Sequence, residues 1–86
     1  MESSNLPPIR WERFSELSAR EREIVAGLCS GASNEDLALS LDLTVSTVKT
    51  TLANVALKVP DVPRGGSWRL RLVLYAFGAN ASAWGA

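Results

Sequence analysis

Hydrophobic residues recur with a helical period in three short stretches between residues 17 and 59. The third stretch carries four aliphatic residues at intervals of four, three and four positions: Val48, Leu52, Val55 and Val59. These intervals place all four on one face of an α-helix, and Thr44 stands where a threonine side chain can cap the helix N-terminus. The pattern therefore predicts a helix over about residues 45–58 with one buried face.

The opposite face of this helix is polar near its start. At about 100° per residue, the outward positions and their flanks are occupied by Ser46, Thr47, Lys49, Thr50, Ala53 and Leu57. A helix that presents small hydroxyl side chains and one lysine at its N-terminal end is suited to insertion into a groove.

A second helix is expected directly before it, over residues 34–41, with Ser33 as its N-terminal cap. The side chains that it would bury are Leu37, Ala38 and Leu41. Only Asp42 and Leu43 separate this helix from Thr44. Two helices joined by so tight a turn, the second with a polar N-terminal face, are typical of a helix-turn-helix, whose second helix can enter the major groove of DNA.

The first helix is expected to begin after Ser18. Ser18 and Glu21 have the spacing of a capping box, in which each side chain accepts a hydrogen bond from the other's backbone N–H. The buried face of this helix is expected to comprise Ile24, Val25, Leu28 and Cys29. Gly31 is a natural stop for the helix. As the chain's single cysteine, Cys29 excludes an internal disulfide, and we expect it to be a buried structural thiol.

A fourth helix is expected beyond the proline- and glycine-containing loop over residues 60–66. Ser67 would cap this helix, which spans Trp68–Phe77 and is apolar on almost every side. One face can pack on the first and third helices, which would leave the other face exposed for a partner. The alternative, a helix wholly sunk into the core, stays open on the sequence alone.

One small domain accommodates these elements. We expect it to span residues 16–79, after a tail and short turn over residues 1–15 and before a tail over residues 80–86. Within the turn, Trp11 and Phe14 lie three positions apart. We interpret them as covering the edge of a small core, with stacking on nucleic-acid bases as the less favoured alternative.

The formal net charge is zero, but the charges are unevenly distributed along the chain. Residues 1–43 carry four arginines against eight acidic residues, whereas residues 44–86 carry five basic residues against Asp61 alone. Affinity for DNA depends largely on neutralising phosphates, and the basic excess begins where the third helix begins. The distribution favours a basic face around that helix over charges scattered on a solvated surface.

Several function classes lack the residues that they need. The sequence has no histidine, one cysteine and no glycine-rich phosphate loop beside a strand, so neither a metal cluster nor a nucleophile–base pair can be assembled. We therefore expect no enzyme activity, no catalytic residue, no metal and no cofactor. The lack of a secretory signal and of an apolar run of about 20 residues favours a cytoplasmic protein with no membrane partner.

Three motifs follow one another at a defined spacing: Leu17–Val25 (LSAREREIV), Gly31–Ala38 (GASNEDLA) and Ser46–Thr50 (STVKT). Together they resemble the LuxR/GerE-type helix-turn-helix domain of bacterial transcription regulators, and a weaker similarity continues over Arg69–Ala76. The resemblance implies an all-α fold of four helices, a tri-helical core plus a fourth helix used for dimerisation. It further implies a regulator that binds double-stranded DNA as a homodimer. We expect that regulator to be stand-alone and associated with the nucleoid.

Carried over residue by residue, the resemblance places the DNA contacts on the third helix, at Ser46, Thr47, Lys49, Thr50 and Lys58. Among these, Lys49 is the leading candidate for a base or phosphate contact. The dimer contacts are expected on the exposed side of the fourth helix, at Leu70, Leu74 and Phe77.

Three positions depart from the family's pattern. Glu35 stands where lysine is frequent, Thr51 where histidine is frequent, and Leu57 where arginine is frequent. Each change removes a positive or hydrogen-bonding group from the side expected to face DNA. An alternative therefore stays open: a protein-interaction module on the same fold, similar in this respect to a sigma region-four domain, that binds another transcription regulator or RNA polymerase.

Overall fold

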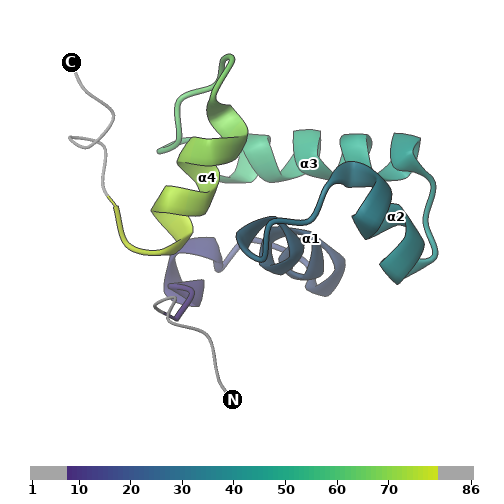
Figure 1. Ribbon diagram of the computed structural model, residues 1–86. Coiled ribbons are helices and arrows are strands. Elements are labelled where there is room, and N and C mark those ends of the chain that lie inside the picture. Colours follow the sequence, from purple (N-terminus) through teal and green to yellow (C-terminus); the bar gives the residue numbers. More distant parts are fainter. Residues whose placement is uncertain (1–7, 80–86) are drawn as a thin grey trace.

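A computed structural model describes residues 8–79, so the expected tails over residues 1–7 and 80–86 lie outside the described part. The elements are a short 3-10 helix and four α-helices: η1 (Trp11–Phe14), α1 (Ala19–Cys29), α2 (Asn34–Leu41), α3 (Val45–Lys58) and α4 (Trp68–Ala76). No strand occurs between residues 8 and 79. Helix α3 packs against α1 and α2, and α1 in turn packs against α4 (Figure 1). The expected all-α, four-helix fold is confirmed.

The N-termini of the first three α-helices are capped as expected. The Ser18 N–H donates to Glu21 Oε1 at 2.7 Å and the Glu21 N–H donates to Ser18 Oγ at 3.2 Å, which completes the capping box. Ser33 forms a second capping box with Asp36, and Thr44 Oγ1 accepts a hydrogen bond from the Thr47 N–H at 3.0 Å. These local bonds satisfy backbone donors that the first turn of a helix leaves unpaired.

The prediction that Ser67 caps α4 is wrong. Ser67 stands at the position directly before the helix, but its side chain accepts no capping hydrogen bond. Its φ of −106° and ψ of 20° are far from the extended conformation that Ser18, Ser33 and Thr44 adopt at their caps. Instead, the Trp68 N–H donates to the Gly65 carbonyl at 3.0 Å, so the loop backbone itself closes the turn before α4. The helix also ends one residue earlier than expected, at Ala76.

Tight backbone turns end α1 and α2. Gly31 has a φ of 89°, and the neighbouring Ala32 N–H donates back to the Gly27 carbonyl at 3.0 Å. At the end of α2, Asp42 adopts the left-handed conformation, and the Leu43 N–H donates to the Ala38 carbonyl at 2.8 Å. Both are the Schellman arrangement, in which a left-handed residue reverses the chain directly after a helix. The turn at Asp42 brings α3 against α2 and completes the helix-turn-helix.

The helix faces that the hydrophobic spacing predicts to be buried form the core. Its largest fully enclosed side chains are Phe14, Ile24, Val25, Val48, Val55, Val62 and Leu72. Cys29 is buried as expected, whereas Leu41 is only half-buried. In α4, Leu72 and Ala76 are buried while Leu70 and Leu74 are exposed, so α4 is not wholly sunk into the core.

The segment before α1 belongs to this core. Phe14 is 1% exposed and lies edge-to-face against Trp11 and Tyr75. The Arg13 guanidinium donates to the carbonyls of Tyr75, Gly78 and Ala79 at the end of α4. Phe14 therefore covers the core as expected, and Arg13 joins η1 to the C-terminus of α4. No helix within residues 8–79 is both long and apolar enough to cross a bilayer.

Candidate nucleic-acid interface

The outward side of α3 is exposed along its whole length. Ser46, Thr47, Lys49 and Thr50 all lie on the surface at its N-terminal half. Ser46, Lys49 and Thr50 make no side-chain hydrogen bond to any other residue between 8 and 79, whereas the Thr47 hydroxyl is bonded to Thr44 at 2.9 Å. Three of these four polar side chains are therefore unengaged and point away from the core.

The charges at the start of α3 favour an anionic partner. Its first turn contains no acidic residue, so no carboxylate on α3 itself offsets the positive end of the helix dipole. By contrast, the first turn of α2 carries Glu35 and Asp36. Asp36 is occupied in a capping box, and Glu35 is exposed. Glu35 is thus the free negative charge on the helix that precedes α3.

Lys58 is placed differently from the other candidate contacts. Its Nζ donates to both carboxylate oxygens of Glu21, at 2.9 and 3.1 Å, across 37 positions in sequence. Glu21 is only 6% exposed. The hydrogen bond from Lys58, and next the one from the Ser18 backbone, lower the pKa of the Glu21 carboxyl. Lys58 therefore joins the C-terminal end of α3 to the N-terminal end of α1, a role that its sequence position did not suggest.

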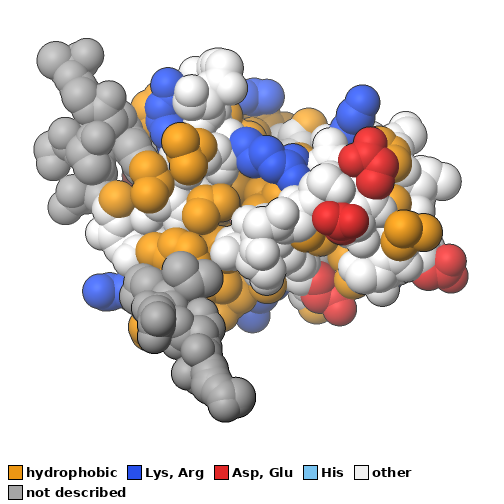
Figure 2. All heavy atoms as spheres, in the orientation of Figure 1, with side chains coloured by type: hydrophobic (Ala, Val, Ile, Leu, Met, Phe, Trp, Pro, Cys, Tyr) orange, Lys and Arg blue, Asp and Glu red, His pale blue; other side chains and the backbone are white. Residues whose placement is uncertain are grey.

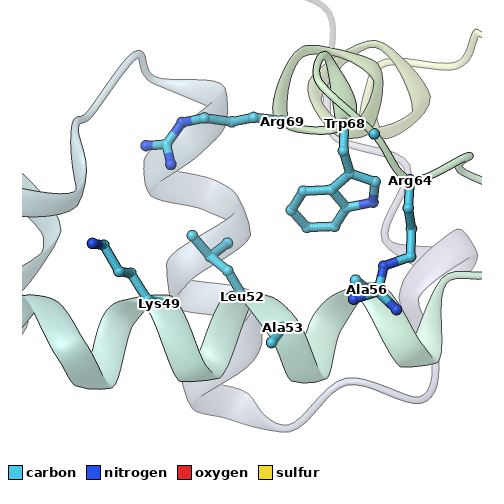
Figure 3. Close-up of a pocket in the computed structure, with 8 residues that line it drawn as sticks. Lys49, Leu52, Ala53, Ala56, Arg64, Trp68 and Arg69 are labelled. Carbon is cyan, nitrogen blue, oxygen red and sulfur yellow. The ribbon is translucent and has the colours of Figure 1, made fainter.

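A groove of about 360 Å³ lies between α3 and the residues that lead into α4 (Figure 3). Its lining residues are Lys49, Leu52, Ala53, Ala56, Arg64, Gly65, Trp68 and Arg69. The sequence reasoning identified Lys49 but missed Arg64 and Arg69 as its neighbours. The excess of basic residues after residue 43 was the signal for them, although it could not show which of these cations line the same groove.

Arg69 is a fixed wall of this groove. Its guanidinium donates to Asn34 Oδ1 at 2.7 Å and to the Ala32 carbonyl at 2.9 Å. These bonds tie the start of α4 to the start of α2, so the helix-turn-helix and α4 are held together on this side.

A second, more apolar surface lies on α4. Leu70 is 60% and Leu74 is 42% exposed, and Phe77 is partly buried. Of these three residues, Leu70 borders a hollow of about 530 Å³, whose lining is Leu28, Cys29, Gly31, Gly66, Ser67, Arg69, Leu70 and Val73. In Figure 2, hydrophobic side chains gather over α4, while acidic side chains lie toward the α2 end of the same face. Of the three expected dimer contacts, Leu70 and Leu74 therefore lie on α4 and are exposed, whereas Phe77 directly follows the helix and is partly buried.

Burial determines the pKa of the thiol of Cys29, the single cysteine of the chain. Cys29 lies on the inner side of α1, and burial raises the pKa of its thiol to about 11. Because the thiolate is the reactive form, the raised pKa disfavours reaction of this side chain at neutral pH.

Comparisons with known proteins agree with this architecture. Residues 15–59, which are 45 of the 86 residues, match the luxR family of bacterial regulatory proteins. The monoamine regulon transcriptional regulator of Klebsiella aerogenes is 44% identical over 63 residues, covering 73% of this chain and 25% of that protein. The response regulator protein VraR of Staphylococcus aureus is 36% identical over 73 residues, covering 83% of this chain and 32% of VraR. VraR of Staphylococcus saprophyticus is similar to the same extent.

The chain spans between a quarter and a third of the length of these relatives. No solved structure matches it at a significant level.

Proposed function

The chain belongs to the luxR family of bacterial regulatory proteins, and from this premise we propose that it is a DNA-binding transcription regulator. In this proposal α3 enters the major groove, as the second helix of a helix-turn-helix does. A cytoplasmic location at the nucleoid follows from binding the chromosome.

The unengaged polar side chains at the N-terminal half of α3 carry the proposal. Ser46, Lys49 and Thr50 are exposed and make no side-chain hydrogen bond within residues 8–79, while the buried residues of the same helix fix its orientation. Lysine recognises guanine or phosphate, and serine or threonine hydroxyls can bond to either base edges or phosphates. Thr47 adds a further contact from its position beside Thr44. Lys58 contributes a DNA contact in this proposal only if it exchanges its hydrogen bonds to Glu21 for bonds to a phosphate.

We further propose a homodimer through α4, with Leu70, Leu74 and Phe77 at its interface. A two-fold dimer would place two copies of α3 on the half-sites of a palindromic DNA site. The exposure of Leu70 and Leu74 supports this arrangement, because large aliphatic side chains on a nine-residue helix gain stability when a partner covers them.

A selection for enriched sites from mixed genomic DNA, followed by a salt titration, tests the DNA-binding proposal. We expect log K to fall with log salt at a slope of roughly −4 to −7, from about four to eight phosphate contacts. Lys49→Ala should weaken specific binding by about 1–3 kcal/mol, whereas Thr50→Ala should mainly relax the sequence preference. Using the 86-residue chain itself also tests whether the domain binds DNA as a stand-alone regulator.

Glu35→Lys provides the complementary change. It replaces an exposed negative charge beside α3 with a positive one, so it should tighten binding to any sequence and steepen the salt dependence by about one contact. Failure of the wild type to retain DNA at about 50 mM salt would contradict the proposal. So would a wild type that binds DNA no more tightly than its Lys49→Ala variant.

One observation favours a second function, a protein-interaction module on the same fold. Leu57 is 70% exposed, and it lies with Ala53 on the outward side of α3. A large apolar side chain there would be poorly placed against phosphates but well placed against a regulator or RNA polymerase. If Leu57→Ala abolishes capture of such a partner while Lys49→Ala leaves DNA retention unchanged, this second function is the correct one.

A further inference from the structure

The loop that joins α3 to α4 brings an additional cation to the DNA-facing side of the molecule. The luxR-family match ends at residue 59, so the loop over residues 60–67 lies beyond it. Arg64 in this loop is exposed and lines the groove between α3 and α4. Lys49 lies toward one end of that groove and Arg64 toward the other (Figure 3).

The floor of the groove is apolar and carries no charge. Leu52, Ala53 and Ala56 of α3 form it, the Trp68 ring stands on its wall, and no carboxylate lines it. Alanine side chains allow an extended anionic chain to approach the helix closely. The charged side chains of the lining, Lys49, Arg64 and Arg69, are therefore all cations, which is complementary to a phosphate backbone.

Lys49 and Arg64 are the cations available to such a chain. Arg69 is bonded to Asn34 and Ala32, whereas Lys49 and Arg64 have no side-chain hydrogen bond or ion pair with other residues in the described part. No residue between 8 and 79 neutralises their charges.

The loop is held in a defined position. Val62 is buried in the core. The Arg71 guanidinium donates to the Pro63 carbonyl at 3.2 Å, and the Tyr75 hydroxyl donates to Asp61 at 3.4 Å. Helix α4 thus anchors the loop on both sides of Val62, directly before Arg64. Because folding already orders this part of the loop, a contact made by Arg64 costs less conformational entropy.

We propose that this groove seats the sugar–phosphate backbone of one DNA strand, with Arg64 as a phosphate contact outside the helix-turn-helix. The inference rests on the proposed DNA-binding function and extends it to the α3–α4 loop. An α-helix of about 10–12 Å diameter fills a major groove of about 12 Å width, so the strands that border the groove run along the flanks of the inserted helix. Lys49 and Ala53 belong both to the exposed side of α3 and to this groove, which makes the two surfaces continuous.

The test is a salt titration of binding to a mixed-sequence DNA duplex. Arg64→Ala should weaken binding and make the slope of log K against log salt less steep by about one per protomer, without changing the preferred sequence. Arg22→Ala is the matched control, because Arg22 is an exposed cation on α1 outside the groove; it should leave the slope close to that of the wild type. Arg64→Lys should restore most of the slope, since a point charge suffices for a phosphate.

Neutral methylphosphonate linkages, introduced one at a time into a selected duplex, locate the contact. At one flanking position the wild type should lose affinity while Arg64→Ala loses none. If the wild type binds DNA but Arg64→Ala behaves like Arg22→Ala at every position, this inference is wrong and the DNA-binding proposal stands. If the wild type itself does not retain the duplex, the DNA-binding proposal fails first.

Discussion

At the scale of single residues, Glu21 shows how one side chain can serve two purposes. Its carboxylate closes the capping box of α1 through the Ser18 N–H and also accepts both hydrogen bonds from Lys58. The capping role is local and could be predicted, because its partner lies three residues away. The ion pair could not, because Lys58 reaches Glu21 only when α1 and α3 are packed together. The contact with DNA that the family resemblance implies for Lys58 stays a prediction.

Replacing Glu21 with glutamine tests the pair. Glutamine can still cap the helix, so Glu21→Gln should cost about 1–3 kcal/mol of the free energy of unfolding, chiefly from the lost charge-assisted bond to Lys58. The pKa of Glu21 is lowered on folding, so its stabilising contribution is present above its ordinary pKa of 4.5 and is lost as the pH falls through the lower, folded value. The stability difference between wild type and variant should therefore be constant near neutrality and shrink below pH 4.5.

Urea unfolding of the two chains across this pH range provides the measurement. Lys58→Met supplies the other half of a double-mutant cycle, and additive effects of the two substitutions would show that the pair contributes nothing.

At the scale of elements, the contact between α1 and α2 depends on a glycine inside a helix. A Cβ atom added at Gly27 would lie only 2.2 Å from Leu37 Cδ2 and 3.4 Å from Leu37 Cγ. Leu37 is 2% exposed and cannot turn aside freely. Glycine in a helix interior is ordinarily unfavourable, but here it permits the close approach of α2.

Gly27→Ala should accordingly destabilise the chain, contrary to helix propensity. The gain in propensity is about 0.5–1 kcal/mol, whereas overpacking an enclosed site costs about 1–3 kcal/mol. Thermal unfolding followed by circular dichroism measures the sum. Gly66→Ala is the control, because a Cβ atom at that position meets nothing within 4 Å, and it should be close to neutral. A Gly27→Ala variant that melts at a higher temperature than the wild type would show that Leu37 moves aside at little cost.

At the scale of the whole molecule, the two exposed surfaces lie on different helices. The polar side of α3 and the basic groove beside it are proposed for DNA, and the apolar side of α4 is proposed for a second copy. Arg69 ties α4 to the start of α2 through its bonds to Asn34 and Ala32, and α2 in turn packs against α3. A dimer through α4 would therefore hold the two copies of α3 at a fixed spacing, which is what binding to a palindromic site requires.

A charge on the exposed side of α4 tests the dimer. Leu74→Glu should give a folded monomer in sedimentation equilibrium, and its affinity for a palindromic DNA site should fall because each half-site binds alone. Leu39→Glu is the matched control for oligomeric state, since Leu39 is 84% exposed on α2. Equal sedimentation of the two variants, both as dimers, would place the interface elsewhere.

The sequence alone determined the helices, most of their ends and their buried faces. These features depend on contacts between residues three to five positions apart, such as Ser18 with Glu21 or Gly27 with Ala32, and a linear pattern records such contacts directly. The same locality explains the error at Ser67, where a suitable residue type was present but the loop backbone did not adopt the conformation that capping needs.

Which side chains meet across helices became visible only once the helices were packed together. The bonds from Lys58 to Glu21 and from Arg69 to Asn34 depend on how the helices cross. So do the fit of Gly27 against Leu37 and the placement of Lys49 and Arg64 along one groove. Crossing geometry is set by the packing of the whole core at once, and no periodic signal along the chain encodes it. The candidate recognition residues of α3 could therefore be predicted from the sequence, whereas the basic groove beside them could not.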